Sequence, residues 1–136
     1  MDMLFDEDWK ELEQIAEILE PFKNHTKSME GRRDSLAETI PTMELLLGKL
    51  EAAKTKWEGT AIGLSCNNAW NIFNKYYKFL DRSPVYIAAI VLDPRYKWAW
   101  FEKVWAEHPD WITEAKRNIK ELWGEYNSKL RLLTNS

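Results

Sequence analysis

The chain contains a single cysteine, Cys66, and only five glycines and five prolines among its 136 residues. One cysteine excludes an internal disulfide, and it excludes a cysteine-based zinc site because such a site needs several ligands. We therefore expect a reducing, intracellular environment, either nuclear or cytoplasmic. Few glycines and prolines, combined with 45% apolar residues, are typical of a chain that folds.

Long hydrophobic runs are also missing from the sequence. No apolar stretch approaches the roughly 20 residues that cross a bilayer, and residues 1–9 are acidic, unlike a basic signal leader. We therefore expect no membrane partner and no export. The length is sufficient for one hydrophobic core and too short for two ordinary domains. Residues 1–136 are predicted to form a single helical domain.

Tryptophan, in contrast, is abundant, with eight in the chain. Each ring can bury a large area, and its indole N–H then needs a partner. Rings at helical spacing are more often core residues than binding groups, so we predict that most of the eight are buried.

Charge is distributed unevenly along the chain. The first 30 residues hold nine acidic and three basic side chains, whereas the remainder holds thirteen acidic and sixteen basic ones. The positive excess of the remainder is too small to predict nucleic-acid binding by itself, although a local basic face is compatible with it.

Apolar residues recur three or four positions apart along most of the chain, which predicts helices. Pro21 is expected to kink the first helix without ending it, and Gly31 to end it. An apolar stripe on that helix consists of Phe5, Trp9, Leu12, Ile15, Ala16, Leu19 and Phe22. The predicted helices cover about residues 8–29, 35–57, 61–80, 84–92, 95–107 and 110–132.

One of these segments, residues 85–92, is apolar enough for a buried strand to compete with a helix. Ser83 followed by Pro84 is a helix start signal and favours the helix. Asp93 followed by Pro94 is predicted to end this helix and to cap the next one. The predicted fold is therefore all-α, an irregular bundle of about six helices.

The residues that most often support chemistry have no suitable partners in the sequence. Neither His25 nor His108 has a carboxylate or cysteine three or four residues later, and Cys66 has no histidine nearby. Cys66 is predicted to be a small core residue. We predict no catalytic residue, no metal, no other cofactor and no small-molecule substrate, and hence no enzyme in this chain alone.

The candidate contact residues follow the short apolar segment. Arg95, Lys97 and Trp98 offer two cations for phosphate beside a ring that can stack on an unpaired base. Trp100 is added because Trp98 lies on the apolar face of the same helix, which leaves Trp100 to point elsewhere. The structural alternative is that Arg95 pairs with Asp93 or Asp81 and only stabilises the turn.

The motif Leu92-Asp-Pro-Arg-Tyr-Lys97, with the paired Tyr76-Tyr77 before it, resembles a pattern of the hAT family of DNA transposases. The segments at residues 9–22 and 35–43 are similar to the helical insertion region of fungal members. The resemblance covers nearly the whole chain. In such transposases the insertion interrupts a ribonuclease-H-like core with three catalytic acids, none of which can be placed on this sequence.

The resemblance implies a transposase-derived, catalytically incomplete nuclear domain. Such a domain supports DNA transposition by binding transposon-end DNA, or by assembling with the transposase core or with itself. An alternative is a domesticated helical protein-interaction module without DNA binding, in which exposed parts of Trp98, Trp100, Trp105 and Trp111 form the partner surface. A nuclease that contributes part of a composite site in trans is the weakest possibility.

Overall fold

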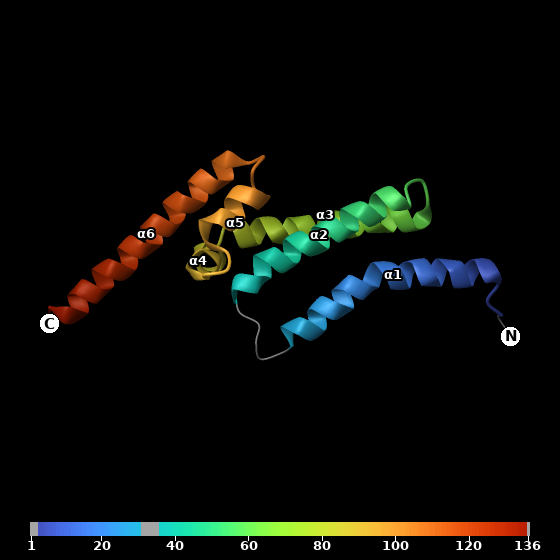
Figure 1. Ribbon diagram of the computed structural model, residues 1–136, viewed down its shortest axis with the longest axis horizontal. Coiled ribbons are helices and arrows are strands. Elements are labelled where there is room, and N and C mark those ends of the chain that lie inside the picture. Colours follow the sequence, from blue (N-terminus) through green and yellow to red (C-terminus); the bar gives the residue numbers. More distant parts are fainter. Residues whose placement is uncertain (1–2, 31–35, 136) are drawn as a thin grey trace. The chain divides into compact units, whose positions relative to one another are not determined.

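The computed structural model describes residues 3–30 and 36–135, and within them the chain forms six α-helices and one short 3-10 helix, without strands (Figure 1). This confirms the predicted all-α bundle. The elements are α1 (Asp6–Met29), η1 (Leu36–Glu38), α2 (Thr39–Lys56), α3 (Ala61–Asp81), α4 (Pro84–Leu92), α5 (Lys97–Val104) and α6 (Pro109–Thr134). The predicted helix end at Gly31, the predicted start at Ser35 and the side chain of Asp81 lie outside the described parts.

These helices form two compact units. The first unit contains Met1–Ser35 and Pro41–Tyr77, and the second contains Leu36–Ile40 and Lys78–Ser136. The long helix α3 therefore contributes its first five turns to one unit and its last turn to the other.

The first unit has a largely aliphatic core built on α2 and α3. Apolar residues of α2 form one side of this core, because Leu46, Leu47, Leu50 and Ala53 are all buried. Ile62 and Cys66 of α3 pack against Ala53, with Ile18 and Trp57 at the edge of this cluster. Burial raises the pKa of the Cys66 thiol, as expected of a core cysteine.

Helix α1 contacts this core with little of its surface. Its ring contact is Phe22 edge-on to Phe73, at 5.7 Å between centroids, and Glu17 accepts a hydrogen bond from Lys56 at 2.9 Å. Every residue of α1 is described, and none is buried. Most of the apolar stripe of this helix is therefore exposed. The helix continues past Pro21 to Met29, as predicted.

The second unit has a core of aromatic and branched residues. Phe101 of α5 is 0% exposed, as are Ile40 and Ile90, and Ile87, Trp105 and Ala115 are also buried. Helix α4 lies at the centre of this unit, because it packs against η1, α5 and α6. The choice of a helix over a strand for the apolar segment was correct, and Pro84 begins that helix.

Two predicted helix starts are shifted in the structure. Asp93 does not cap the next helix directly, because residues 93–96 form a turn and α5 begins at Lys97. The carboxylate of Asp93 binds Arg95 within that turn instead. The last helix begins at Pro109, so that Asp110 lies in its first turn and His108 precedes it.

The prediction for the tryptophans was also wrong in part. All eight lie in the described residues, and one of them, Trp105, is buried at 3% exposure. Trp57, Trp70, Trp98, Trp100 and Trp111 are half-buried, and Trp9 and Trp123 are 56% and 66% exposed. The paired tyrosines also differ, because Tyr76 is 60% exposed whereas Tyr77 is buried. Helical spacing identifies an apolar face but does not determine whether another element covers it.

Candidate functional site

Arg95 lies in the turn between α4 and α5 and is surrounded by two carboxylates. Its Nε and Nη2 atoms donate to the two oxygens of Asp93, at 3.1 and 2.8 Å. Its Nη2 atom also lies 2.6 Å from Glu38 Oε1, and Tyr96 donates its hydroxyl to the other oxygen of Glu38 at 2.9 Å. The arrangement ties the α4–α5 turn to η1.

The electrostatics of this cluster follow from its hydrogen bonds. The bonds from Arg95 lower the pKa of Asp93, and Asp93 in turn raises the pKa of Arg95. Burial, followed by the hydrogen bond to Glu38, raises the pKa of Tyr96. The guanidinium therefore carries a charge that two nearby carboxylates already balance, even though its side chain is 61% exposed. A phosphate would have to compete with both of them.

Lys97 is the cation of the predicted set that forms no ion pair with any described side chain, and it occupies an unusual backbone position. Its φ is 55°, in the left-handed region, which costs a non-glycine residue on the order of 1–2 kcal/mol. The Lys97 amide donates to the carbonyl of Asp93 at 3.1 Å, which stabilises this conformation at the first residue of α5.

The two predicted tryptophans lie together against one buried ring. The centroids of Trp98 and Trp100 lie 5.6 and 5.0 Å from that of Phe101, and Lys116 Nζ lies 5.4 Å from the Trp98 ring centre. Both indoles are half-buried. Of the predicted set, Trp98 and Trp100 thus share Phe101, while Arg95 is bound to Asp93 and Glu38.

Sequence reasoning missed a cavity in the second unit. It has a volume of about 500 Å³ and is lined by Lys78, Arg82, Ile87, Trp105, Trp111, Glu114, Ala115 and Asn118. These residues come from α3, α4, the end of α5, and α6. No sequence signal groups them, because only the packing of four elements brings them to one place.

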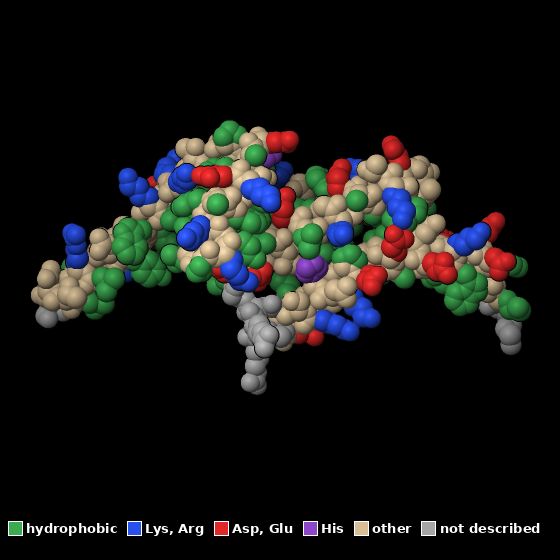
Figure 2. Space-filling model, viewed as in Figure 1, with side chains coloured by type: hydrophobic (Ala, Val, Ile, Leu, Met, Phe, Trp, Pro, Cys, Tyr) green, Lys and Arg blue, Asp and Glu red, His purple; other side chains and the backbone are tan. Residues whose placement is uncertain are grey.

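A second feature missed from the sequence is the exposed apolar half of α6. Apolar residues in the first half of α6 pack into the second unit, where Ala115 is buried and Ile112 and Ile119 are half-buried. In the second half, Trp123, Tyr126 and Leu130 are between 54% and 66% exposed. Figure 2 shows hydrophobic side chains at the surface around the C-terminal end of the chain.

Among the described residues, no group of three or more histidine, cysteine or acidic side chains is placed to hold a metal. Over the same residues, no helix is both long enough and apolar enough to cross a bilayer. No family model, curated protein or solved structure matches this chain. The two surface features and the cavity are therefore interpreted from their own geometry.

Proposed function

We propose that this chain is a helical assembly module that associates with a second copy of itself. The observation that carries this proposal is the exposed apolar stripe on the second half of α6. Trp123, Tyr126 and Leu130 are spaced three and four residues apart, so they lie on one face, and each is more than half exposed. A contiguous apolar face of this kind is typical of an interaction surface.

The residues beside this stripe are basic or neutral. Positions that flank a seven-residue stripe select the partner helix by charge. On α6 these positions include Lys120 and Lys129, which are exposed, and Asn127, which is half-buried. Lys129 Nζ lies 6.0 Å from the Tyr126 ring centre, which places this charge beside the apolar face. Pairing two α6 helices would bring like charges together.

The first half of α1 has the same spacing with the opposite charge. Phe5, Trp9 and Leu12 are 76%, 56% and 45% exposed. Asp6 and Glu13 flank them, each one residue after a stripe position, and both are exposed. Two α1 helices would therefore repel each other, whereas α1 of one copy and α6 of another are complementary in charge and in apolar character.

The proposed contact therefore joins α1 of one copy to α6 of a second copy. Such a contact closes a dimer when it is made reciprocally, and it extends into a chain of copies when it is made in one direction. Its hydrophobic part supplies the affinity, and its charges select the orientation and the partner.

Analytical ultracentrifugation over a range of protein concentrations tests this proposal. We expect a concentration-dependent dimer or larger species that weakens with added salt. The double variant K120E/K129E is expected to weaken the association roughly tenfold or more. Lys75→Glu, an exposed change on α3, is the matched control and should leave it unchanged.

A charge-swap mixture provides the discriminating measurement. A D6K/E13K variant mixed with K120E/K129E should recover association between unlike chains beyond that of either variant alone. A wild-type chain that is monomeric at every concentration would contradict the proposal. A dimer that is insensitive to both charge variants would also contradict it.

DNA is the second candidate partner, and it follows from the resemblance to the hAT insertion region. The observation in its favour is that Lys97 is exposed next to the half-buried Trp98, whose ring Lys116 also approaches. Gel shifts with single-stranded, hairpin and branched DNA over a salt series would measure it, since phosphate contacts give a steep salt slope. Binding that is unchanged in K97Q/K116Q would exclude this surface. We propose the assembly function first because Arg95 is already paired with carboxylates.

A further inference from the structure

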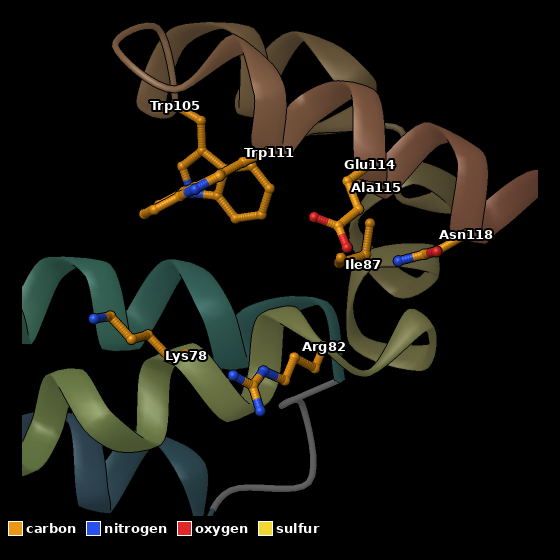
Figure 3. A pocket seen from close by; sticks show the side chains of 8 residues that line it. All are labelled: Lys78, Arg82, Ile87, Trp105, Trp111, Glu114, Ala115 and Asn118. Atoms are coloured by element: carbon orange, nitrogen blue, oxygen red, sulfur yellow. The ribbon is translucent and has the colours of Figure 1, made fainter.

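The cavity of the second unit has one wall of apolar residues and another that carries charged residues (Figure 3). Its volume of about 500 Å³ lies within the range of about 300–1,000 Å³ that is common for small-molecule sites. All of its lining residues belong to one compact unit. It shares no residue with the exposed apolar faces of α1 and α6 that form the proposed contact, so a ligand here is independent of the proposed assembly function.

The apolar wall is preformed by residues that the core holds in place. Ile87, Trp105 and Ala115 are 1%, 3% and 3% exposed, so the packing fixes them and each shows only a small part of its surface to the cavity. Trp111 is fixed on two sides: its ring lies edge-on to Trp105 at 5.7 Å, and the His108 ring stacks on it at 3.9 Å. A planar aromatic group can contact these rings without requiring them to reorganise.

The opposite wall carries positive charge. Lys78 and Arg82 lie one turn apart near the end of α3, and Figure 3 shows them on the other side of the cavity from Trp105 and Trp111. Both side chains are exposed, and neither forms an ion pair with any described side chain. They differ in this respect from Arg95, whose charge two carboxylates balance.

The remaining polar groups limit how much negative charge the cavity accepts. Glu114 lines it and lies 3.8 Å from Arg117 on the following turn of α6. Asn118 adds a neutral amide that can donate or accept a hydrogen bond. Two cations face one carboxylate, and that carboxylate has its own partner, so the cavity is matched to a ligand with one negative group.

We propose that this cavity binds a small aromatic carboxylate. The ring would lie mainly against the half-buried Trp111, beside the small exposed parts of Trp105 and Ile87. The carboxylate would accept hydrogen bonds from Lys78 and Arg82. An aromatic molecule without the acid would leave the cations unpaired, and an acid without the ring would leave the apolar wall exposed to water. The ligand is held without chemical change, so the site is one of recognition and not of catalysis.

Three probes separate the contribution of the ring to binding from that of the carboxylate. Indole-3-acetate carries both groups, indole carries only the ring, and acetate carries only the carboxylate. Isothermal titration and ligand-observed NMR on the full chain would measure their dissociation constants. We expect indole-3-acetate to bind at least tenfold more tightly than either indole or acetate. The difference in affinity between indole-3-acetate and indole should become smaller at high salt, because Lys78 and Arg82 are exposed.

Variants assign that binding to the cavity. The double variant K78Q/R82Q should remove the preference of the chain for indole-3-acetate over indole, so that both bind equally weakly. Lys103→Gln, an exposed change on α5 outside the cavity, is the matched control and should bind like the wild type. Trp111→Leu should weaken indole and indole-3-acetate alike. If that variant does not fold, the surface variant K78Q/R82Q, checked by circular dichroism, still decides the question.

Several results would overturn the proposal. They are the absence of binding by indole-3-acetate at millimolar concentration, equal affinity for indole-3-acetate and indole in the wild type, and an affinity that K78Q/R82Q leaves unchanged. Loss of association in K120E/K129E would not affect these measurements, so failure of the assembly function and failure of the ligand site can be told apart.

Discussion

The two compact units bury different kinds of side chain. The first buries mainly leucine, isoleucine, alanine and cysteine along α2 and α3, two helices of 18 and 21 residues, with Tyr77 as its buried aromatic residue. The second centres on Phe101, on a helix of eight residues, and the rings of Trp98, Trp100 and Trp105 surround it. Long helices can build a core from many small contacts, whereas short helices need a few large ones.

This difference has consequences for both stability and function. Cavities lie beside both cores, and in the first unit aliphatic residues such as Ile18, Leu50 and Ile62 line one of about 420 Å³. In the second unit the ring of Trp105, which follows the short helix α5, packs edge to face against Trp111 in the first turn of α6, and a cavity lies beside both rings. The aromatic core therefore differs in placing fixed rings next to the charged residues of its cavity.

The largest expected effect comes from truncating the central ring of the second unit. Phe101→Ala should lower the free energy of unfolding by about 3–5 kcal/mol, because it removes a ring that three tryptophans contact and leaves a void. Urea denaturation followed by intrinsic fluorescence would measure the change. Phe101→Leu is the matched control and should cost clearly less. Equal losses for both variants would show that ring contacts do not hold this core.

A glycine of the first unit gives the next largest effect. A side chain at Gly63 would overlap the backbone carbonyl of Trp57, so Gly63→Ala should destabilise the fold by about 1–3 kcal/mol. Gly48, inside α2, has nothing within 4 Å of the position that a Cβ atom would take. Gly48→Ala should therefore stabilise the fold by about 0.5–1 kcal/mol. Thermal melts of both variants would compare them, and a neutral Gly63→Ala would contradict the close approach.

Acid should weaken the second unit through Asp93, with the smallest effect of the three. Its folded-state pKa lies below the unfolded value, so its bond to Arg95 contributes fully above that value. The contribution is lost as the pH falls below about 4, toward the folded-state pKa. Because Arg95 is largely exposed, the effect is modest and decreases with salt. Melting temperatures at pH 6 and pH 3 should fall less in Asp93→Asn than in the wild type, and an equal fall would contradict this role.

The comparison of the units also shows how far the sequence predicts the structure. The helix at residues 35–57 was predicted from its apolar spacing, and Leu46, Leu50 and Ala53 of α2 are buried. The Ser83-Pro84 signal placed α4 correctly. The stripe of α1 has equally regular spacing, yet it is mostly exposed. Periodicity describes one helix, whereas burial depends on a second element that the pattern of the first does not specify.

The candidate site was less predictable for the same reason. Asp93 was one of the two partners predicted for Arg95, the other being Asp81. The contact of Glu38 with Tyr96, in contrast, joins residues 58 positions apart in the sequence. The cavity combines residues from four elements. Local patterns identify neighbours along the chain, and such distant pairs arise only from the packing of α4 against η1 and α6.

The turn after α4 joins three successive amides to a single residue. The Arg95 amide donates to the Asp93 carboxylate at 2.9 Å, and the amides of Tyr96 and Lys97 both donate to the Asp93 carbonyl at 3.1 Å. These three hydrogens cannot exchange with solvent independently, because releasing Asp93 exposes all of them. Their exchange rates should therefore converge on one value, that of the opening of this corner, which makes the α4–α5 junction a single cooperative unit.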